Sequence, residues 1–137
     1  MALAEAERDP LAESIGLLDR RVGGLPELHF PRGWTLSGSW ERAQREQDKG
    51  GPLTPAERMV WLSDSEAPRR VLWCIRDGRI RAECSCEAYQ FRGWCAHLAS
   101  CWWRWCRSDL AVTDLDTGRS HLHPPWWLSI EDEEVRR

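Results

Sequence analysis

The sequence predicts a small single α+β domain in which a β-hairpin is followed by an α-helix. The chain of 137 residues is long enough for one domain but too short for two with separate cores. Two apolar runs flank Asp77-Gly78, a strong signal for a two-residue hairpin turn. Pairs of metal-ligand residues follow at positions 84/86 and 95/97, where the hairpin ends and a helical pattern begins.

Residues 1–68 form an N-terminal flank that we expect to pack on the hairpin and its helix. A helix is predicted over 10–22, because Asp9-Pro10 is a typical helix start and Gly23-Gly24 a typical end. Between them, apolar residues recur at helical spacing, namely Leu11, Ile15, Leu18 and Val22. This stripe packs on the domain or, alternatively, binds a partner. An irregular connection is expected over 25–39 and a polar helix over 40–49.

Two structures are compatible with residues 54–62. Thr54 and Glu57 match a capping box with Pro55 in the first helical position, which favours a short helix. The run from 59 to 62 is equally good strand material, being β-branched, aromatic and apolar. The sequence does not separate a helix from a strand here.

The hairpin is predicted to pair a strand over 71–75 with a strand over 80–84. Counting outward from the turn sets Ile75 opposite Ile80, and it sets Trp73 opposite Ala82 and Val71 opposite Cys84. One face is therefore apolar. The other face carries Arg76, Arg79 and Arg81, and it is either simply exposed to solvent or part of a surface that contacts phosphates.

A helix is predicted over 95–107, with its apolar stripe made by Leu98, Trp102 and Trp105. Beyond Ser108 the helical pattern fades. Residues 108–137 form a C-terminal extension with a stiff Pro-Pro-Trp-Trp segment at 124–127 and an acidic tail over 131–134 that we expect to be disordered.

The metal ligands predicted are Cys84, Cys86, Cys95 and His97. Zinc prefers four soft or borderline ligands in a closed tetrahedron, and two short ligand pairs on either side of a loop supply that geometry. Because residues two apart point to different sides of a helix, Cys95 should lie at or before the N-cap and only His97 in the first turn. Four protein ligands leave no open coordination position, so one structural Zn²⁺ is expected, and not a catalytic ion.

The other cysteines and histidines have no comparable pattern. Cys74, Cys101 and Cys106 are expected to be core thiols. Cys101 follows His97 by one helical turn and is the alternative ligand if one of the four is wrong. His121 and His123 are candidates for a second metal, although no partner pair lies near them in the sequence.

The stretch from Arg70 to Trp105 resembles the SWIM zinc finger. The likeness rests on Cys-x-Cys, eight residues and Cys-x-His, preceded by a hairpin and followed by an apolar helix. That family is a short ββα zinc module of plant transposase-related proteins, bacterial Snf-type ATPases and recombination accessory proteins, and its proposed roles are DNA binding and protein–protein interaction. The resemblance implies a finger over residues 69–107 and carries over only the four ligands. No ATPase or transposase motif accompanies it, which implies a stand-alone finger.

Charge is distributed unevenly along the chain, whose net charge is −3. Residues 1–68 hold 8 basic and 12 acidic side chains, residues 69–107 hold 8 and 3, and residues 108–137 hold 3 and 7. The finger is thus the basic segment between two acidic ones. This is a modest indication of a polyanionic partner.

Two hypotheses for function follow. In the first, the finger binds DNA or RNA as part of an accessory subunit in nucleic-acid transactions, with phosphate and base contacts from Arg76, Arg79, Arg81, Arg92, Trp94, Arg104 and Arg107. In the second, the protein is an adaptor or scaffold subunit that docks a larger nucleic-acid-processing protein through Trp102, Trp103, Trp126 and Trp127.

Other function classes are not expected. The sequence has no paired carboxylates or triad-like order, so we expect neither an enzyme nor a small-molecule substrate. No run approaches the ~20 apolar residues of a membrane-spanning helix. The first nine residues carry three acids where a signal peptide would be basic, and the cysteines have metal-ligand spacing. We therefore expect a cytoplasmic, reducing location, or a nuclear one in a eukaryote.

Overall fold

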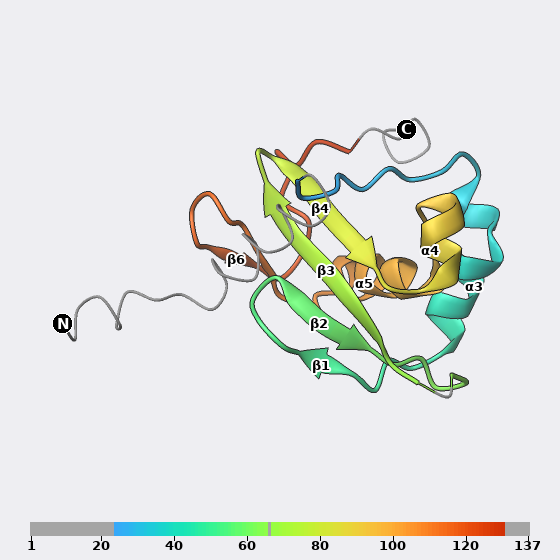
Figure 1. Ribbon diagram of the computed structural model, residues 1–137. Helices are drawn as coiled ribbons and strands as arrows, with labels where there is room; N and C mark the ends of the chain where they lie inside the picture. The colour runs from blue at the N-terminus through green and yellow to red at the C-terminus, as the bar shows by residue number, and fades with distance from the viewer. Residues whose placement is uncertain (1–23, 66, 131–137) are drawn as a thin grey trace.

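The computed structural model describes residues 24–65 and 67–130, and it confirms the predicted α+β class. The predicted helix over 10–22 and the acidic tail over 131–134 lie outside the described residues. Within the described part, a four-stranded antiparallel sheet has the order β1-β2-β3-β4 (Figure 1). Its strands are β1 (Gly51–Pro52), β2 (Glu57–Val60), β3 (Arg69–Arg76) and β4 (Arg79–Cys84). The helical elements are η1 (Trp34–Leu36), α3 (Gly38–Arg45), α4 (Glu87–Arg92) and α5 (Ala96–Cys106).

The β3–β4 hairpin has the predicted register. Ile75 pairs with Ile80 across the turn, and the two further predicted pairs, Trp73–Ala82 and Val71–Cys84, are also present. Asp77 and Gly78 have φ of 55° and 72°, the left-handed values that a type I′ turn requires. All of 71–75 is buried, because β3 has a main core on one face and a smaller cluster on the other, formed with Leu25, Ala56, Leu72 and Cys74.

The segment 57–60 is a strand and not a helix. The hydroxyl of Thr54 accepts hydrogen bonds from the backbone N–H groups of Ala56 (3.2 Å) and Glu57 (3.0 Å), as a cap would, but this contact closes a turn. The chain then pairs with β3, with Glu57 opposite Leu72. Pairing with β3 therefore determines the secondary structure of residues 57–60, which the local capping signal does not determine.

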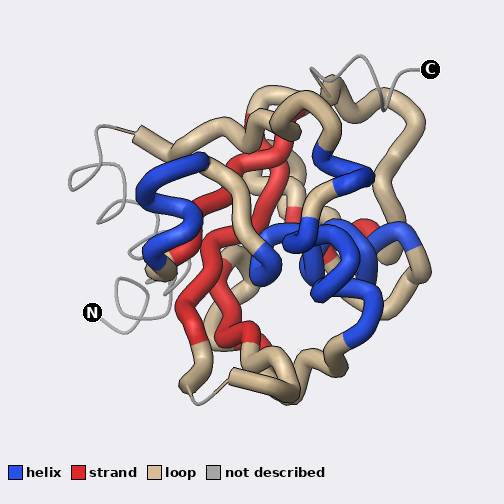
Figure 2. Tube along the Cα trace, turned by 90° about the vertical axis from the view of Figure 1, so that its right-hand side faces the viewer, coloured by secondary structure: helices blue, strands red, loops and turns tan. Residues whose placement is uncertain are grey.

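The main core lies between the sheet and α5, against which α3 packs. The predicted stripe of α5 is buried, with Leu98 and Trp105 wholly enclosed. The rings of Trp73 and Trp105 meet edge to face, with centroids 6.3 Å apart. Figure 2 turns the end of the molecule that carries α3 and α4 toward the viewer. The sheet and α5 therefore enclose most of the core of the described chain.

Several elements differ from the prediction. The eight residues between the two ligand pairs, expected to be a loop, contain α4, which begins at Cys86 as N-cap and ends at Gly93 with φ 68°. The polar helix α3 ends at Arg45 and not at residue 49, and its N-cap is Ser37. In the extension, β5 (Val112–Thr113) pairs with β6 (Ser120–His121), a small sheet that the sequence does not predict.

The connection over 25–39 is irregular apart from η1, as expected, and part of it follows the free edge of β4. The backbone N–H of Leu28 donates to the carbonyl of Ile80 (2.9 Å), and that of Ala82 donates to the carbonyl of Pro26 (2.8 Å). Figure 1 shows this blue segment beside β4. In the described residues, no helix is long and apolar enough to cross a bilayer.

Candidate metal centre

The four predicted ligands lie where three elements meet. Cys84 is the last residue of β4, and Cys86 is the N-cap of α4. Cys95 is the N-cap of α5, and His97 lies in the first turn of that helix. The prediction that Cys95 precedes the helix while His97 belongs to it is therefore confirmed.

The ligand atoms of these four residues lie within 4.8 Å of one another, and all four residues are buried. Around a tetrahedral zinc with Zn–S bonds of about 2.3 Å, ligand sulfurs are about 3.8 Å apart. The spacing is therefore suitable for a single ion held by every member of the group. These residues could bind a metal ion.

Two backbone N–H groups point at the sulfurs. That of Tyr89 donates to the Sγ of Cys86, and that of Leu98 donates to the Sγ of Cys95, each at 3.4 Å. Both come from the first turn of a helix, α4 or α5. Such donors stabilise a thiolate, which is the form of cysteine that binds a metal.

Hydrogen bonds among the three thiols concentrate negative charge on one of them. Bonds from Cys84 and Cys95 lower the pKa of Cys86. The hydrogen bond with Cys86 raises the pKa of Cys84 to about 12, and hydrogen bonds with Cys84 and Cys86 raise the pKa of Cys95. Three adjacent thiolates repel one another, so full ionisation of this group requires a cation among them.

The imidazole of His97 completes the donor set. Its Nδ1 atom is buried with no hydrogen-bond partner among the described residues. Buried polar atoms normally have a partner. Three sulfurs and one imidazole are the donors that zinc and similar soft or borderline cations prefer, so the residues present fit such an ion.

The other cysteines and histidines join no second group of three or more potential ligands in the described chain. Cys74 and Cys101 are buried thiols, as expected, and desolvation raises the pKa of each to about 12. Cys106 is exposed, which corrects its assignment to the core. The ring of His121 lies against Trp127, with centroids 5.6 Å apart.

Most of the predicted phosphate-binding arginines are paired with acidic groups. Arg79 bonds Glu27 at 2.6 Å, and Arg104 bonds Asp48 at 3.0 Å. Weaker pairs join Arg81 to Asp77 at 3.6 Å and Arg107 to Asp109 at 3.8 Å, and Arg76 also has an interaction partner. Arg92 differs, since it is exposed and has no ion-pair partner among the described residues. The structure therefore does not present these arginines as one unneutralised surface.

Burial also divides the predicted tryptophans. Trp94 and Trp102 are 4% and 7% exposed and belong to the core, so neither offers a face for stacking or docking, which corrects both assignments. Trp103 is partly exposed and lies between Trp40 and the guanidinium of Arg107. Trp126 is 94% exposed and Trp127 39% exposed, so these two remain available for contacts.

A cleft of about 860 Å³ borders the metal centre and was not predicted. Cys86, Cys95 and His97 form part of its wall. Arginines from separate segments line it as well, namely Arg32, Arg42, Arg69 and Arg92. Only Arg92 among them was predicted as a site residue, because nothing local in the sequence indicates that the other three lie near the ligands.

Comparison with known proteins identifies no relative: the sequence matches no protein-family model, no curated protein and no solved structure.

Proposed function

We propose that Cys84, Cys86, Cys95 and His97 hold one structural Zn²⁺ in a finger of the SWIM type. The observation that carries this proposal is the close, buried group of four donor atoms at the junction of β4, α4 and α5. Four protein ligands would fill the tetrahedral shell and leave no position for water or substrate. The ion would stabilise the fold without catalysing a reaction. Its cysteine ligands would have to stay out of disulfides, which suits a reducing compartment.

Metal analysis tests the zinc proposal. Protein purified without added metal should contain about one zinc per chain by elemental mass spectrometry, as expected for a single four-ligand site. Cys95→Ser should lose that zinc, while Cys106→Ser should keep it, because Cys106 is exposed and outside the group. Zinc retained in full by Cys95→Ser, or a different metal in the wild type, would contradict the assignment.

We further propose that the protein is a non-catalytic accessory subunit in nucleic-acid transactions that binds DNA or RNA. The support is Arg92, which is exposed, has no ion-pair partner among the described residues and lies on α4, whose N-cap is Cys86. Binding of this kind depends on phosphate neutralisation and therefore falls steeply with salt. A larger nucleic-acid-processing protein would be its partner.

Fluorescence anisotropy of labelled single- and double-stranded DNA and RNA tests this proposal. Zinc-loaded protein should bind at least one of these, and the affinity should fall as salt rises from about 50 to about 200 mM. Chelator-treated protein should bind more weakly. No binding to any of the four nucleic acids at low salt would refute the proposal.

A purely protein-binding adaptor is the second candidate, and it rests on Trp126. This side chain is almost fully exposed and follows Pro124-Pro125, which limits the conformations of the segment. Exposed tryptophans are enriched at the centres of protein interfaces. The adaptor hypothesis predicts that no nucleic acid binds at low salt, and so the same titration separates the two functions.

A further inference from the structure

The cleft beside the metal centre has a basic lining. Four arginines, Arg32, Arg42, Arg69 and Arg92, line its volume of about 860 Å³. Among the described residues, Glu87 is the one acidic side chain that lines it. Its remaining lining includes the hydroxyl residues Ser37, Ser39 and Ser65 and the ligands Cys86, Cys95 and His97. The cleft therefore combines positive charge with hydrogen-bonding groups, which suits an anionic ligand.

Three of these arginines have no acidic partner in the part of the chain that the structure describes. Arg32, Arg69 and Arg92 are exposed, and none has an ion-pair or hydrogen-bond partner for its side chain among the described residues. This distinguishes them from Arg79 and Arg104, whose guanidinium groups bond carboxylates at 2.6 and 3.0 Å. Exposed charges without partners leave the cleft electropositive.

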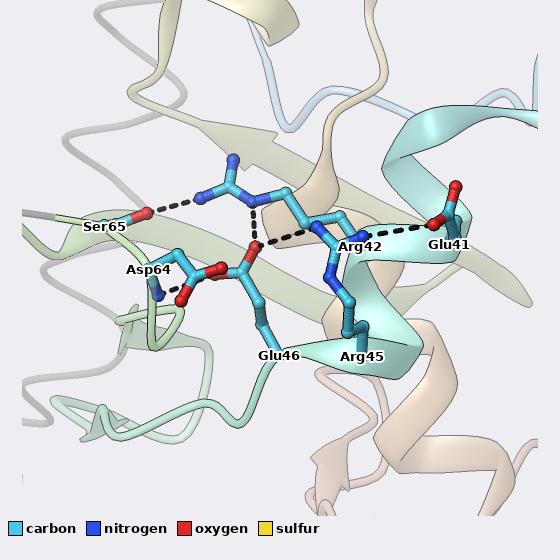
Figure 3. Close-up of polar contacts among 6 residues, drawn as sticks. All are labelled: Glu41, Arg42, Arg45, Glu46, Asp64 and Ser65. Carbon is cyan, nitrogen blue, oxygen red and sulfur yellow. Dashed lines mark hydrogen bonds and ion pairs between the residues drawn. The ribbon is translucent and has the colours of Figure 1, made fainter.

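The fourth arginine is held in a fixed direction. The Nε of Arg42 donates to the carboxylate of Glu46, and its Nη2 donates to the hydroxyl of Ser65 at 2.6 Å (Figure 3). Glu46 is itself fixed, since it accepts the backbone N–H of Asp64 at 2.8 Å. The Nη1 of Arg42 has no hydrogen bond to a described residue. Because Glu46 neutralises this guanidinium, Arg42 offers an oriented donor and not additional net charge.

We propose that this cleft binds the sugar–phosphate backbone of single-stranded DNA or RNA. This proposal rests on the proposed nucleic-acid function. It differs in the contact surface, which is the cleft instead of the arginines of the β3–β4 hairpin. The three unpaired guanidinium groups come from separate segments, before η1, at the start of β3 and at the end of α4. This distribution suits the repeated phosphates of a polymer better than one phosphate group.

The concave shape favours a single strand over a duplex. Duplex DNA is read by a helix or ribbon that projects from the protein into a groove. Single strands instead lie in basic grooves on the protein. The volume, within the range of about 300–1,000 Å³ that is typical of ligand pockets, exceeds what a lone phosphate fills.

The metal centre would determine the shape of one wall. Cys86 is the N-cap of α4, which ends at Arg92, and Cys95 and His97 begin α5. An ion bound by these ligands would fix α4 relative to α5 and thereby position Arg92. Removal of the ion should therefore weaken strand binding even where the protein stays folded.

The test uses anisotropy of labelled oligo(dT) and oligo(U) with full-length, zinc-loaded protein across a salt series. The variants are Arg32→Gln, Arg69→Gln and Arg92→Gln, singly and combined. Arg119→Gln is the matched control, because Arg119 is exposed, has no side-chain partner among the described residues and lies outside the cleft. Arg79→Gln probes the hairpin face. Circular dichroism and zinc content confirm that each variant is folded.

Affinity falls with salt, so a plot of log affinity against log salt has a negative slope. Each cleft substitution should reduce the magnitude of this slope by about 0.7, the value for one phosphate contact on a single strand. In the triple variant the magnitude of the slope should fall by about 2, and the affinity at low salt should fall at least about tenfold. Arg119→Gln should match the wild type.

Two results would overturn the proposal, and they differ in what they imply for the protein. A triple variant with the wild-type slope, while Arg79→Gln loses affinity, would refute the cleft but leave nucleic-acid binding in place. Wild-type protein that binds no strand at low salt would refute both. In that case, binding of a labelled phosphoserine peptide that the triple variant loses would assign the cleft to a phosphorylated protein.

Discussion

Loss of the metal is expected to destabilise the protein substantially, because the ion would join β4 to both α4 and α5. A ligand that binds only the folded state stabilises it by about 4 kcal/mol when its free concentration is 1,000 times its Kd. For a domain of this size, 1 kcal/mol corresponds to about 4 °C in Tm. Chelation should therefore lower the Tm by about 15 °C. Without chelator, Cys95→Ser should already have a Tm close to that of the chelator-treated wild type. Addition of chelator should change the Tm of this variant little.

Thermal unfolding monitored by tryptophan fluorescence is the suitable assay, since Trp73 and Trp105 are buried between the sheet and α5. Metal content is measured on the same samples, with and without chelator. Cys106→Ser is the matched control, and its Tm should follow that of the wild type in both conditions, because Cys106 is exposed. A wild-type Tm that falls by less than about 2 °C after measured removal of the ion would refute the structural role.

Two further predictions concern the fold around the cleft and the sheet. Burial opposes ionisation of Glu46, but hydrogen bonds from Arg42 and the Asp64 backbone, with the nearby guanidinium charges, outweigh it and lower its pKa below 4.5. Its contribution is therefore present at neutral pH and is lost as pH falls through the lowered pKa. Glu46→Gln should cost about 2 kcal/mol at pH 7 by urea unfolding, and this cost should decrease progressively as the pH is lowered below 4.5. A cost that does not change with pH would contradict this. Gly50→Ala should lower the free energy of unfolding by about 1–3 kcal/mol, because the added Cβ would lie 1.9 Å from the backbone oxygen of Met59. Gly38→Ala is the control and should be tolerated, because a Cβ there would meet open space. Equal urea midpoints for the two variants would refute the steric argument.

The elements that the sequence predicts well are those whose signals are contiguous. The hairpin register follows from the turn at Asp77-Gly78 and the alternation of apolar residues around it. The ligands follow from spacing within a single stretch, and the N-cap position of Cys95 follows from helix geometry. In each case, neighbouring residues alone determine the outcome.

The elements that it misses depend on distant partners. No side chain of α4 is buried, so this helix has no apolar stripe that would reveal it, although Gly93 is a typical helix end. Strand β2 is decided by pairing with β3 and not by its own residues. Trp94 and Trp102 are buried against Phe30, which lies in a segment expected to be irregular and only partly packed.

Charge counted in blocks along the sequence is misleading for the same reason. Acidic residues of the segment 1–68 neutralise arginines of the segment 69–107 directly, as Glu27 does for Arg79 and Asp48 for Arg104. Residues 69–107 are consequently less basic in the folded protein than the sequence indicates, and the acidic residues of 1–68 are less repulsive to a polyanion. The cleft combines Arg32 with Arg69, which lie in different blocks of this charge count. A net charge of −3 is therefore compatible with a locally basic site, and the decisive quantity is the number of arginines that the fold leaves unpaired.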